Sequence, residues 1–370
     1  MSTPIPFLDL PRQHAPLVEE ITEAIRELVT RASFVGGPVV SEFEAAFAEF
    51  CEVGECIGVA NGTEALMLGL MGAGVDGRSK VVLPTYTFIA TAEAVSHLGA
   101  RIVLVDVDRD TGNLSVDALR EIDGAHAVIP VHLYGQPADM GPLMDVAEEK
   151  GWAVVEDCAQ AHGARYDGQT VGSFGAFGAF SFYPTKNLGA IGDAGAVVGP
   201  KGEAMDRIRR LANHGRSERY THTEIGVNSR LDSLQAAALT IKLAHIQAWN
   251  QARVEAAEMY TERLETVNGL TVPSVKDRRT HVFHLYLMLC EDRVGLGKAL
   301  KAANIGFGSF YETPLHLQPA YAHLGHQAGD FPNAEYLSER CISLPLFPGI
   351  SESQIDRVCG VVREFMSAGG

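Results

Sequence analysis

One lysine stands in an unusual setting within the stretch FSFYPTKNLG, residues 180–189. Lys186 follows an apolar run and has glycines on both sides, where a free ammonium would be costly to desolvate. Most lysines keep the amine in water, but a lysine in an apolar pocket has a lowered pKa, and its neutral amine can bond a carbonyl carbon. The decapeptide alone leaves both interpretations open.

A carboxylate and a strand-to-helix turn accompany this lysine. Asp157 ends the apolar run WAVVED, 29 residues before Lys186, while Asn61, Gly62 and Thr63 join the run CIGVA to a helical pattern. A helix N-terminus offers free N–H groups and a positive dipole end to a phosphate. Taken alone, each feature is more typical of an ordinary cap or turn, so only their combination indicates a function.

Together these residues suit pyridoxal phosphate, which needs a lysine for its aldehyde and an acid beside its ring nitrogen. The cofactor also needs a phosphate cradle and a flat side chain against its ring, for which TYTFIAT offers Tyr86 and Phe88. Neither G-x-G-x-x-G nor G-x-x-x-x-G-K-[ST] opens the helix after Asn61. Dinucleotide and nucleoside triphosphate ligands therefore lose support.

The elements that would position these residues are short apolar runs alternating with helical patterns. Five runs are rich in β-branched residues and show no polar alternation: 56–60, 80–84, 101–108, 126–135 and 152–159. Such runs are typical of parallel strands covered on both faces, and ligands of such sheets gather at the carboxyl ends of the strands. We therefore expect an α/β protein whose mostly parallel sheet brings Asp157 and Lys186 into one cleft.

A long helical pattern follows, from about Leu231 to Leu264, and the texture of the sequence changes after it. The remaining segments, among them HVFHLYLMLC and SQIDRVCGVVREFMSA, resemble a smaller α+β unit. We expect a boundary inside the long helix near residue 246. This gives a large cofactor-binding domain over residues 1–245 and a small C-terminal domain over residues 246–370.

Composition narrows the functional classes. The 370 residues are 46% hydrophobic and carry a formal net charge of −16, which disfavours a nucleic-acid partner. No run is long enough to span a bilayer, and no secretory leader opens the chain. The six cysteines show no C-x-x-C spacing, so we expect no metal site. A cytoplasmic protein with reduced thiols, bound neither to nucleic acid nor to membrane, is the expectation.

Seven motifs follow one another from the N-terminal to the C-terminal part of the chain: NGTEAL, PTYTFIATAEAV, PVHLYGQPADM, VVEDCAQAHGA, FSFYPTKNLGAIGDAGAVV, GVNSRLDSLQAA and PLHLQPAY. In this order the chain resembles the sugar-nucleotide aminotransferases of the DegT/DnrJ/EryC1/StrS family, from residue 7 to about residue 345. The resemblance implies a fold-type I aminotransferase that depends on pyridoxal phosphate and works as a homodimer with composite active sites.

The resemblance also implies a role for individual residues. The catalytic residues would be Lys186, which bonds the cofactor's aldehyde, and Asp157, which pairs with the pyridine nitrogen. Gln160 would face the phenolic oxygen, and Phe88 would stack on the ring. The phosphate would be bound by Gly62, Thr63 and Ser181, together with the partner subunit's Asn228. Substrate contacts would come from Tyr183, Tyr220, Arg230 and His316.

The implied reaction transfers an amino group from L-glutamate to a nucleotide-linked keto hexose. The stretches NLGAIGDAG and GVNSRLDSLQAA resemble members that act on 3-keto sugars, dTDP- or UDP-linked. Members with a T-x-x-x-G-E-G-G-like tail mostly act on 4-keto sugars, which remain the alternative. Sugar dehydratases of this family carry histidine in place of Lys186, and a non-catalytic regulatory homologue would lose Lys186 or Asp157. Both residues are present, while the hexose, the nucleotide and the pathway stay open.

Overall fold

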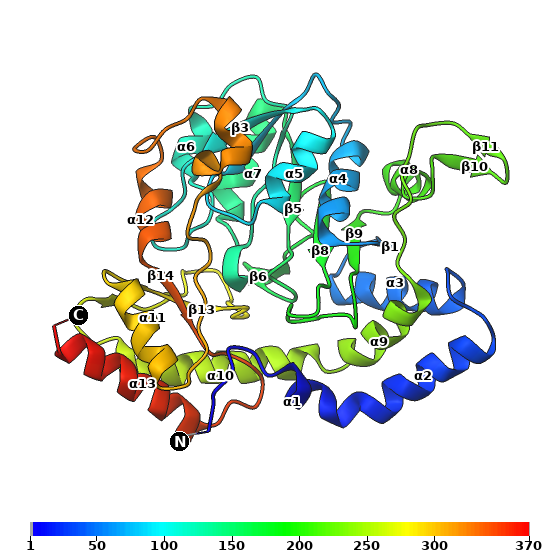
Figure 1. Ribbon diagram of the computed structural model, residues 1–370. Helices are drawn as coiled ribbons and strands as arrows, with labels where there is room; N and C mark the ends of the chain where they lie inside the picture. The colour runs from blue at the N-terminus through cyan, green and yellow to red at the C-terminus, as the bar shows by residue number, and fades with distance from the viewer. Residues whose placement is uncertain (1–2, 370) are drawn as a thin grey trace.

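The computed structural model describes residues 3–369 and is built around a seven-stranded sheet (Figure 1). Its strand order is β1-β9-β8-β5-β4-β2-β3. All neighbours pair in parallel except β9, which is antiparallel to both β1 and β8. The expected α/β class with a mostly parallel sheet is confirmed. The strands are β1 (Glu55–Val59), β2 (Lys80–Pro84), β3 (Arg101–Val105), β4 (Ala127–Val128), β5 (Ala153–Asp157), β8 (Phe177–Ser181) and β9 (Gly195–Gly199).

One strand is much shorter than the sequence predicts. The apolar run 126–135 forms only the two-residue β4. Pro130 has no N–H to donate to a neighbouring strand, so the ladder cannot continue through it. Beyond it, Val131 makes a single bridge to Asp157, and the chain turns into the 3₁₀ helix η2 (Leu133–Gly135). This early end of β4 brings η2 close to the end of β5.

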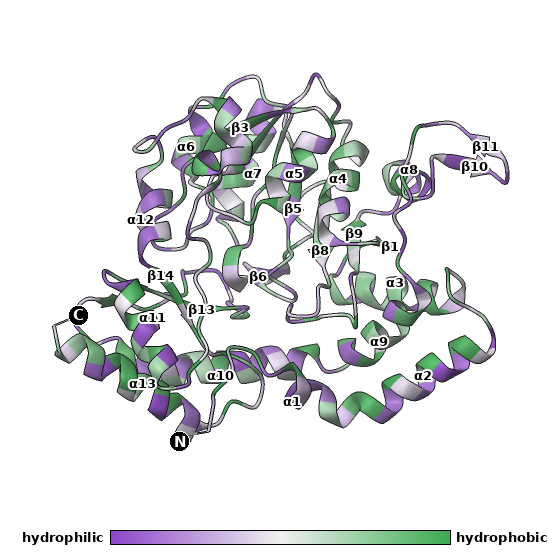
Figure 2. Ribbon diagram, in the orientation of Figure 1, coloured by the Kyte–Doolittle hydropathy of each residue, from purple (hydrophilic) through white to green (hydrophobic). Residues whose placement is uncertain are grey.

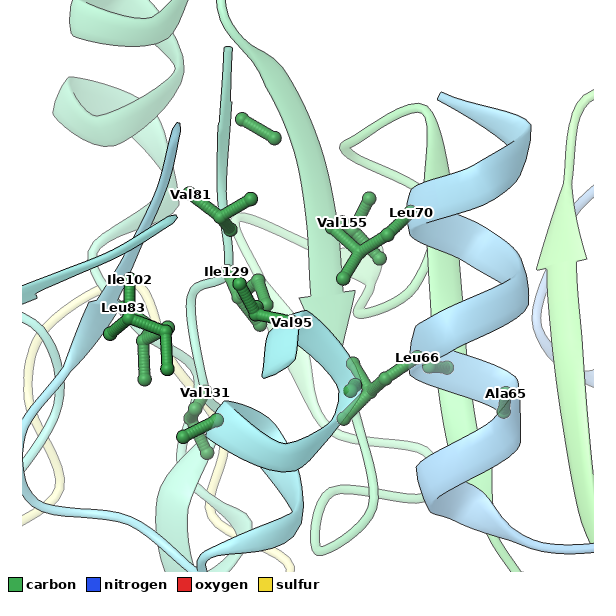
Figure 3. Packing of buried hydrophobic residues seen from close by; sticks show 14 of the residues in the cluster. Ala65, Leu66, Leu70, Val81, Leu83, Val95, Ile102, Ile129, Val131 and Val155 are labelled. Atoms are coloured by element: carbon green, nitrogen blue, oxygen red, sulfur yellow. The ribbon is translucent and has the colours of Figure 1, made fainter. Parts of the chain in front are cut away.

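Helices cover both faces of the sheet. Consecutive strand residues point to opposite sides, and in these strands the residues on both sides are apolar. Val81 packs in one cluster with α4 and α5, whereas Val82 packs in another with α6 and α7. Figure 3 shows Val155 beside Leu70 of α4, and Val81 belongs to the same cluster. A third cluster joins α3 and α9 to β8 and β9. These helices are α3 (Pro38–Phe50), α4 (Gly62–Gly72), α5 (Ala90–His97), α6 (Val116–Arg120), α7 (Met140–Lys150), α8 (Glu203–Leu211) and α9 (Ser233–Leu243).

The long helix expected over 231–264 is two helices, α9 and α10 (Ile246–Leu264), which are interrupted at residues 244–245. After α10, a three-stranded antiparallel sheet packs with α10, α11 and α13 around Tyr260 and Tyr286. Ile5, near the start of the chain, joins this core and pairs with Ile305. The division into domains at residue 246 stays a prediction. The elements are β12 (Leu270–Thr271), β13 (Tyr286–Cys290), β14 (Cys341–Leu344), α11 (Arg293–Ala302) and α13 (Glu352–Ser367).

The segment between α11 and β14 packs against the large sheet's core instead of the small one. Its buried residues Leu315, Tyr321 and Phe331 belong to the same cluster as α4 and β2. This places the chain around residue 310 beside the ends of the large sheet's strands. The segment contains η3 (Leu315–Leu317), η4 (Pro319–Leu324) and α12 (Pro332–Arg340).

The remaining elements lie at the periphery. The hairpin β10–β11 projects away from the sheet, at the right of Figure 1. Helix α2 alternates between hydrophilic and hydrophobic residues along its length (Figure 2). No helix among residues 3–369 is both long and apolar enough to cross a membrane. These elements are α1 (Leu10–His14), η1 (Ala15–Leu17), α2 (Val18–Thr30), β6 (Arg165–Tyr166), β7 (Gln169–Thr170), β10 (Arg216–Glu218) and β11 (Thr221–His222).

Candidate active site

A cavity of about 960 Å³ lies where β5 and β8 end and α4 begins. Most of the residues singled out from the sequence line it: Gly62, Thr63, Phe88, Asp157, Gln160, Ser181, Tyr183 and Lys186. A larger hollow of about 1340 Å³, between α3, α10 and residues 272–283, contains none of them. The smaller cavity is therefore the candidate active site, because chemistry is set by the groups that converge and not by volume.

Lys186 lies in the turn that follows β8. Its N–H donates to the carbonyl of Tyr183 at 2.8 Å. A Cβ atom on Gly189 would lie 2.3 Å from the carbonyl oxygen of Pro184, so the turn closes only around a glycine. Part of the lysine side chain borders the cavity, yet burial lowers the pKa of Lys186 to about 8, while the charge of Asp157 opposes this shift. This setting gives Lys186 a larger fraction of neutral, nucleophilic amine than an ordinary lysine has.

The next residue, Asn187, anchors that turn to the C-terminal part of the chain. Its Nδ2 donates at 2.9 Å both to Asn250 Oδ1 on α10 and to the carbonyl of Val282. Because Nδ2 is committed as a donor, Oδ1 faces His284 Nδ1 at 3.3 Å as an acceptor. The position of Lys186 is therefore tied to α10 and to the segment before β13.

Asp157, the last residue of β5, is 6% exposed and is oriented by two hydrogen bonds. Thr91 Oγ1 donates to its Oδ2 at 2.9 Å, and the N–H of Ala159 donates to its Oδ1 at 3.1 Å. Burial raises the pKa of Asp157, and these two donors together with Lys186 oppose the rise. A cationic group in the cavity would be a further partner that favours the ionised carboxylate.

The start of α4 meets the end of β8 at close range. Asn61 caps the helix, since its Oδ1 accepts from the N–H of Glu64 at 2.9 Å. A Cβ atom on Gly62 would lie 2.6 Å from the Cβ of Ser181, so only glycine allows this approach. Gly62 and Thr63, at the start of this 11-residue helix, line one cavity together with Ser181. The first N–H groups of a helix have no partner within it, and two of these residues carry a hydroxyl. This donor set fits a phosphate group.

The two aromatic candidates for ring stacking, Tyr86 and Phe88, differ in their exposure to the cavity. Tyr86 is fully buried, and its hydroxyl donates to the carbonyl of Phe310 at 2.9 Å. Phe88 is 55% exposed and lines the cavity, with its ring centroid 5.9 Å from that of Tyr311. Phe88 is therefore the one placed to lie against a bound ring. The cavity thus combines a carboxylate for a ring nitrogen, an amine for an aldehyde, donors for a phosphate and a flat side chain for a ring. This combination fits pyridoxal phosphate.

Four predicted residues do not line this cavity. His316 is 2% exposed, and its ring is fixed between Thr85 Oγ1 at 2.9 Å and Glu335 Oε1 at 3.0 Å. Tyr220 is 83% exposed, in the turn between β10 and β11. Asn228 and Arg230 are exposed just after that hairpin. The roles suggested for these residues stay predictions.

The sequence did not identify several of the lining residues as candidates, among them Glu64, Thr91, His284 and Tyr311. Thr91 stands three residues after Phe88, within TYTFIAT, and helical spacing was a signal that could have found it. Tyr311 lies 125 residues after Lys186 in a stretch without a recognisable motif. Only the packing of residues 310–337 on the large sheet brings it here.

One buried group of potential metal ligands, formed by His132, Glu156 and Cys158, lies beside the site. The Glu156 carboxylate already accepts from His132 Nε2 at 3.0 Å and from the N–H groups of Gly172, Phe174 and Gly175 at 2.8–2.9 Å. These four donors satisfy the buried charge without a metal ion. The group stabilises the end of β5 next to Asp157.

Comparison with known proteins assigns the chain to a family. The model of the DegT/DnrJ/EryC1/StrS aminotransferase family matches residues 16–363. The chain belongs to this family. It is an aminotransferase, and its cofactor is pyridoxal phosphate. The family's aminotransferase chemistry and the cavity around Lys186 thus point to the same cofactor.

Individual relatives cover nearly the whole chain. A UDP-N-acetyl-3-dehydro-alpha-D-glucosamine 3-aminotransferase of Acidithiobacillus ferrooxidans is 42% identical over 98% of both chains. The erythromycin biosynthesis sensory transduction protein EryC1 of Saccharopolyspora erythraea is 41% identical, over 97% of this chain and 99% of its own. Among solved structures, DesV of S. venezuelae, in complex with a ketimine intermediate, superposes with a TM-score of 0.96 at 40% identity, over 99% of each chain.

Proposed function

We propose that this aminotransferase moves the amino group of L-glutamate to carbon 3 of a nucleotide-linked 3-keto hexose, dTDP- or UDP-linked. The observation that carries the proposal is the joint placement of Lys186 and Asp157 in one cavity of a chain that matches the family along residues 16–363. Two things support the choice of carbon 3. The tail after Lys186 resembles 3-keto members, and the relative from A. ferrooxidans is named for a 3-dehydro sugar.

The cofactor supplies an aldehyde carbon for amines and a ring that accepts electrons from the carbon being deprotonated. In the proposed assignment, Lys186 Nζ would bond that aldehyde carbon in the resting enzyme. Once displaced, the same amine would take a proton from the substrate carbon that bears the nitrogen and deliver it to the former aldehyde carbon, and it would move a proton the opposite way when the keto sugar is aminated. Burial lowers the pKa of Lys186 to about 8, so a useful fraction of the amine is neutral near neutral pH, whereas an ordinary lysine has a pKa near 10.4.

The other lining residues would hold the cofactor in one orientation. Asp157, with its carboxylate fixed by Thr91 and Ala159, would pair with the ring nitrogen and stabilise its positive charge. Gln160 and Phe88 line the cavity, where Gln160 would face the phenolic oxygen and Phe88 would lie against the ring. Gly62, Thr63 and Ser181, which line the cavity at the start of α4, would bind the phosphate.

The second part of the proposal is a homodimer with composite sites. Asn228 is exposed and does not line its own chain's cavity. Tyr220 lies in the turn of the neighbouring hairpin β10–β11, which projects away from the sheet (Figure 1). We propose that the partner subunit's Asn228 completes the phosphate site, and that the partner's Tyr220 and the partner's Arg230 contact substrate. Tyr183, half exposed in the chain's own cavity, is a further substrate contact. His316 could contribute only if the buried segment around it opened.

The competing functions have weaker support. A 4-keto sugar remains the alternative substrate, since the choice of carbon 3 rests on the resemblance of the tail after Lys186 and on the name of a relative. The relative named as a sensory transduction protein resembles this chain as closely as the named aminotransferase does. Lys186 and Asp157 nevertheless face one cavity here, which a purely regulatory protein would not need. A cytoplasmic location belongs to the same proposal, because all six cysteines are free and buried, as a reducing compartment favours.

The test is an amination assay with [¹⁵N]glutamate and the cofactor-loaded enzyme. Matched 3-keto and 4-keto dTDP- and UDP-hexoses are offered, with the labile 3-keto sugars generated in situ, and NMR locates the nitrogen. We expect ¹⁵N at carbon 3 and at least about a hundredfold preference, because shifting the carbonyl by one carbon moves it by about an ångström or more. Preferred amination of a 4-keto sugar would replace the proposal with its alternative.

A further inference from the structure

The carboxamide of Gln160 can point in only one direction. Its Oε1 accepts from the backbone N–H of Tyr134 at 2.7 Å. A backbone N–H can only donate, so the oxygen of the amide must be on that side and the nitrogen on the other. The nitrogen, Nε2, lies 3.0 Å from the hydroxyl of Tyr311. Since Nε2 carries two hydrogens, one is bound by Tyr311 and the other is free for a group in the cavity.

The N–H that imposes this direction is itself rigidly placed. Tyr134 lies in η2 with a φ of 58°, a left-handed conformation that is uncommon for residues other than glycine. The segment before β13 clamps this turn, because the N–H of His284 donates to the carbonyl of Tyr134 at 2.8 Å. The N–H of Val282 donates to the carbonyl of Gly135 at 2.9 Å. A Cβ atom on Gly135 would lie 2.9–3.0 Å from this segment, so the contact requires glycine.

Tyr311 is held by a cluster of buried hydroxyls. Its N–H donates to Tyr86 Oη at 3.1 Å, and the Tyr86 hydroxyl donates to the carbonyl of Phe310 at 2.9 Å. The Tyr134 hydroxyl lies 3.0 Å from Tyr86 Oη and also bonds the carbonyl of Phe310. Tyr134 therefore fixes both ends of the arrangement. Its backbone orients Gln160, and its side chain holds the segment that carries Tyr311.

We propose that Tyr311 is a positioning residue, which acts through Gln160 to aim one amide hydrogen at the phenolic oxygen of the cofactor. Without the Tyr311 hydroxyl, the bond to Tyr134 still fixes Oε1, but Nε2 loses its second anchor and the amide can twist about the remaining contact. The hydrogen bond to the cofactor would then be longer and less well aligned. The inference rests on the proposed roles of Lys186 and Gln160.

The proposal predicts a spectroscopic change. A hydrogen bond donated to the phenolic oxygen stabilises negative charge there, which favours loss of the proton from the nitrogen that joins Lys186 to the cofactor. Weakening that bond raises the pH at which this proton is lost. The visible absorbance of the loaded enzyme reports this midpoint without any sugar substrate. The other titratable side chains that line the cavity are common to all variants below: Glu64, His97, Asp157, Tyr183, Asp193 and His284.

The experiment compares three variants with the wild type as cofactor-loaded enzymes. Gln160→Ala should raise the midpoint by about one pH unit, and Tyr311→Phe by about half as much. The double variant should match Gln160→Ala alone, because Tyr311 acts only through Gln160. An unchanged midpoint in Tyr311→Phe would reduce its role to packing. A double variant that exceeds Gln160→Ala would mean that Tyr311 acts on the cofactor directly.

Two controls distinguish the proposed role of Tyr311 from a general loss of folding and from a failure of the proposed reaction. Tyr260→Phe also removes a buried hydroxyl, one that donates to the carbonyl of Pro345 at 2.9 Å in the small core, and should leave the midpoint unchanged. Thermal unfolding and cofactor affinity show that each variant is folded and loaded. If Gln160→Ala itself fails to move the midpoint, the roles of Gln160 and Tyr311 both fall, while the amination assay still judges the proposed reaction independently.

Discussion

At the scale of single residues, the site depends on two opposite charges that burial drives toward neutrality. Burial lowers the pKa of Lys186 to about 8 and raises the pKa of Asp157, while each charge opposes the other's shift. In the cofactor-free protein the Lys186 ammonium is therefore destabilising below about pH 8, and this cost fades as the pH rises from about 8 toward the unfolded value near 10.4. A bound cofactor would relieve both groups, because it bonds the amine and brings a cation to the carboxylate.

Asp157→Asn tests the acid's role. Asparagine keeps the size and can still hydrogen-bond Thr91, but it cannot hold a positive charge on the ring nitrogen. We expect cofactor binding to survive and turnover to fall at least about a hundredfold, or ~3 kcal/mol of barrier. Single-turnover rates with L-glutamate measure the effect, and Asp145→Asn, at an exposed position on α7, is the matched control. A rate within threefold of the wild type would rule the role out.

Residue types at strand ends indicated part of this site in advance. Asp157, Lys186 and the turn at Gly62 were recognisable because a charged or glycine residue interrupts an apolar run there. Tyr311 and Glu64 carried no such signal. An isolated tyrosine is typical of ordinary packing, and only the three-dimensional path of the chain puts its hydroxyl 3.0 Å from Gln160.

At the scale of elements, strand pairing explains why two residues far apart in sequence meet. β5 and β8 are parallel neighbours, with Asp157 opposite Ala179, so their carboxyl ends open onto the same cavity. The alternation of apolar runs and helices predicted this arrangement. It did not predict that β9 runs antiparallel between β1 and β8, since direction is not visible in an apolar run.

Two other differences between the prediction and the structure concern the point where an element ends. β4 stops early because Pro130 cannot donate to a ladder, and the turn this creates supplies the N–H that orients Gln160. The interruption between α9 and α10 falls at Ala244 and His245, where neither proline nor glycine marks a helix end. A periodic apolar pattern continues across such a break, so the sequence predicts one helix where two exist.

At the scale of the whole molecule, the proposed dimer makes a specific prediction. Lys186→Ala and Asn228→Ala would damage different parts of one composite site if the partner's Asn228 serves the other chain. A mixed dimer then has one doubly defective site and one intact site. Random exchange of two inactive variants should restore roughly a quarter of the wild-type rate, since half of the dimers are mixed.

The control pair for this experiment comes from one cavity. Lys186→Ala mixed with Asp157→Asn gives mixed dimers in which every site has one defect, because both residues line the same chain's cavity. This pair should recover nothing. Subunit exchange is verified separately with tagged chains, and Asn228→Ala alone must be clearly impaired. With those conditions met, absence of recovery for the first pair would mean that Asn228 serves its own chain.

The central claim is that this cavity, and not burial alone, makes Lys186 the cofactor-bearing lysine. Lys242 is the natural comparison, because burial lowers its pKa to about 8 as well, yet its amine is bound by His14 Nε2 at 2.8 Å and by the carbonyl of Gly189. Borohydride reduction of the loaded enzyme, followed by proteolysis and mass spectrometry, identifies the modified lysine. We predict the reduced cofactor on the peptide that contains Lys186; its attachment to Lys242 or to any other lysine would contradict the account.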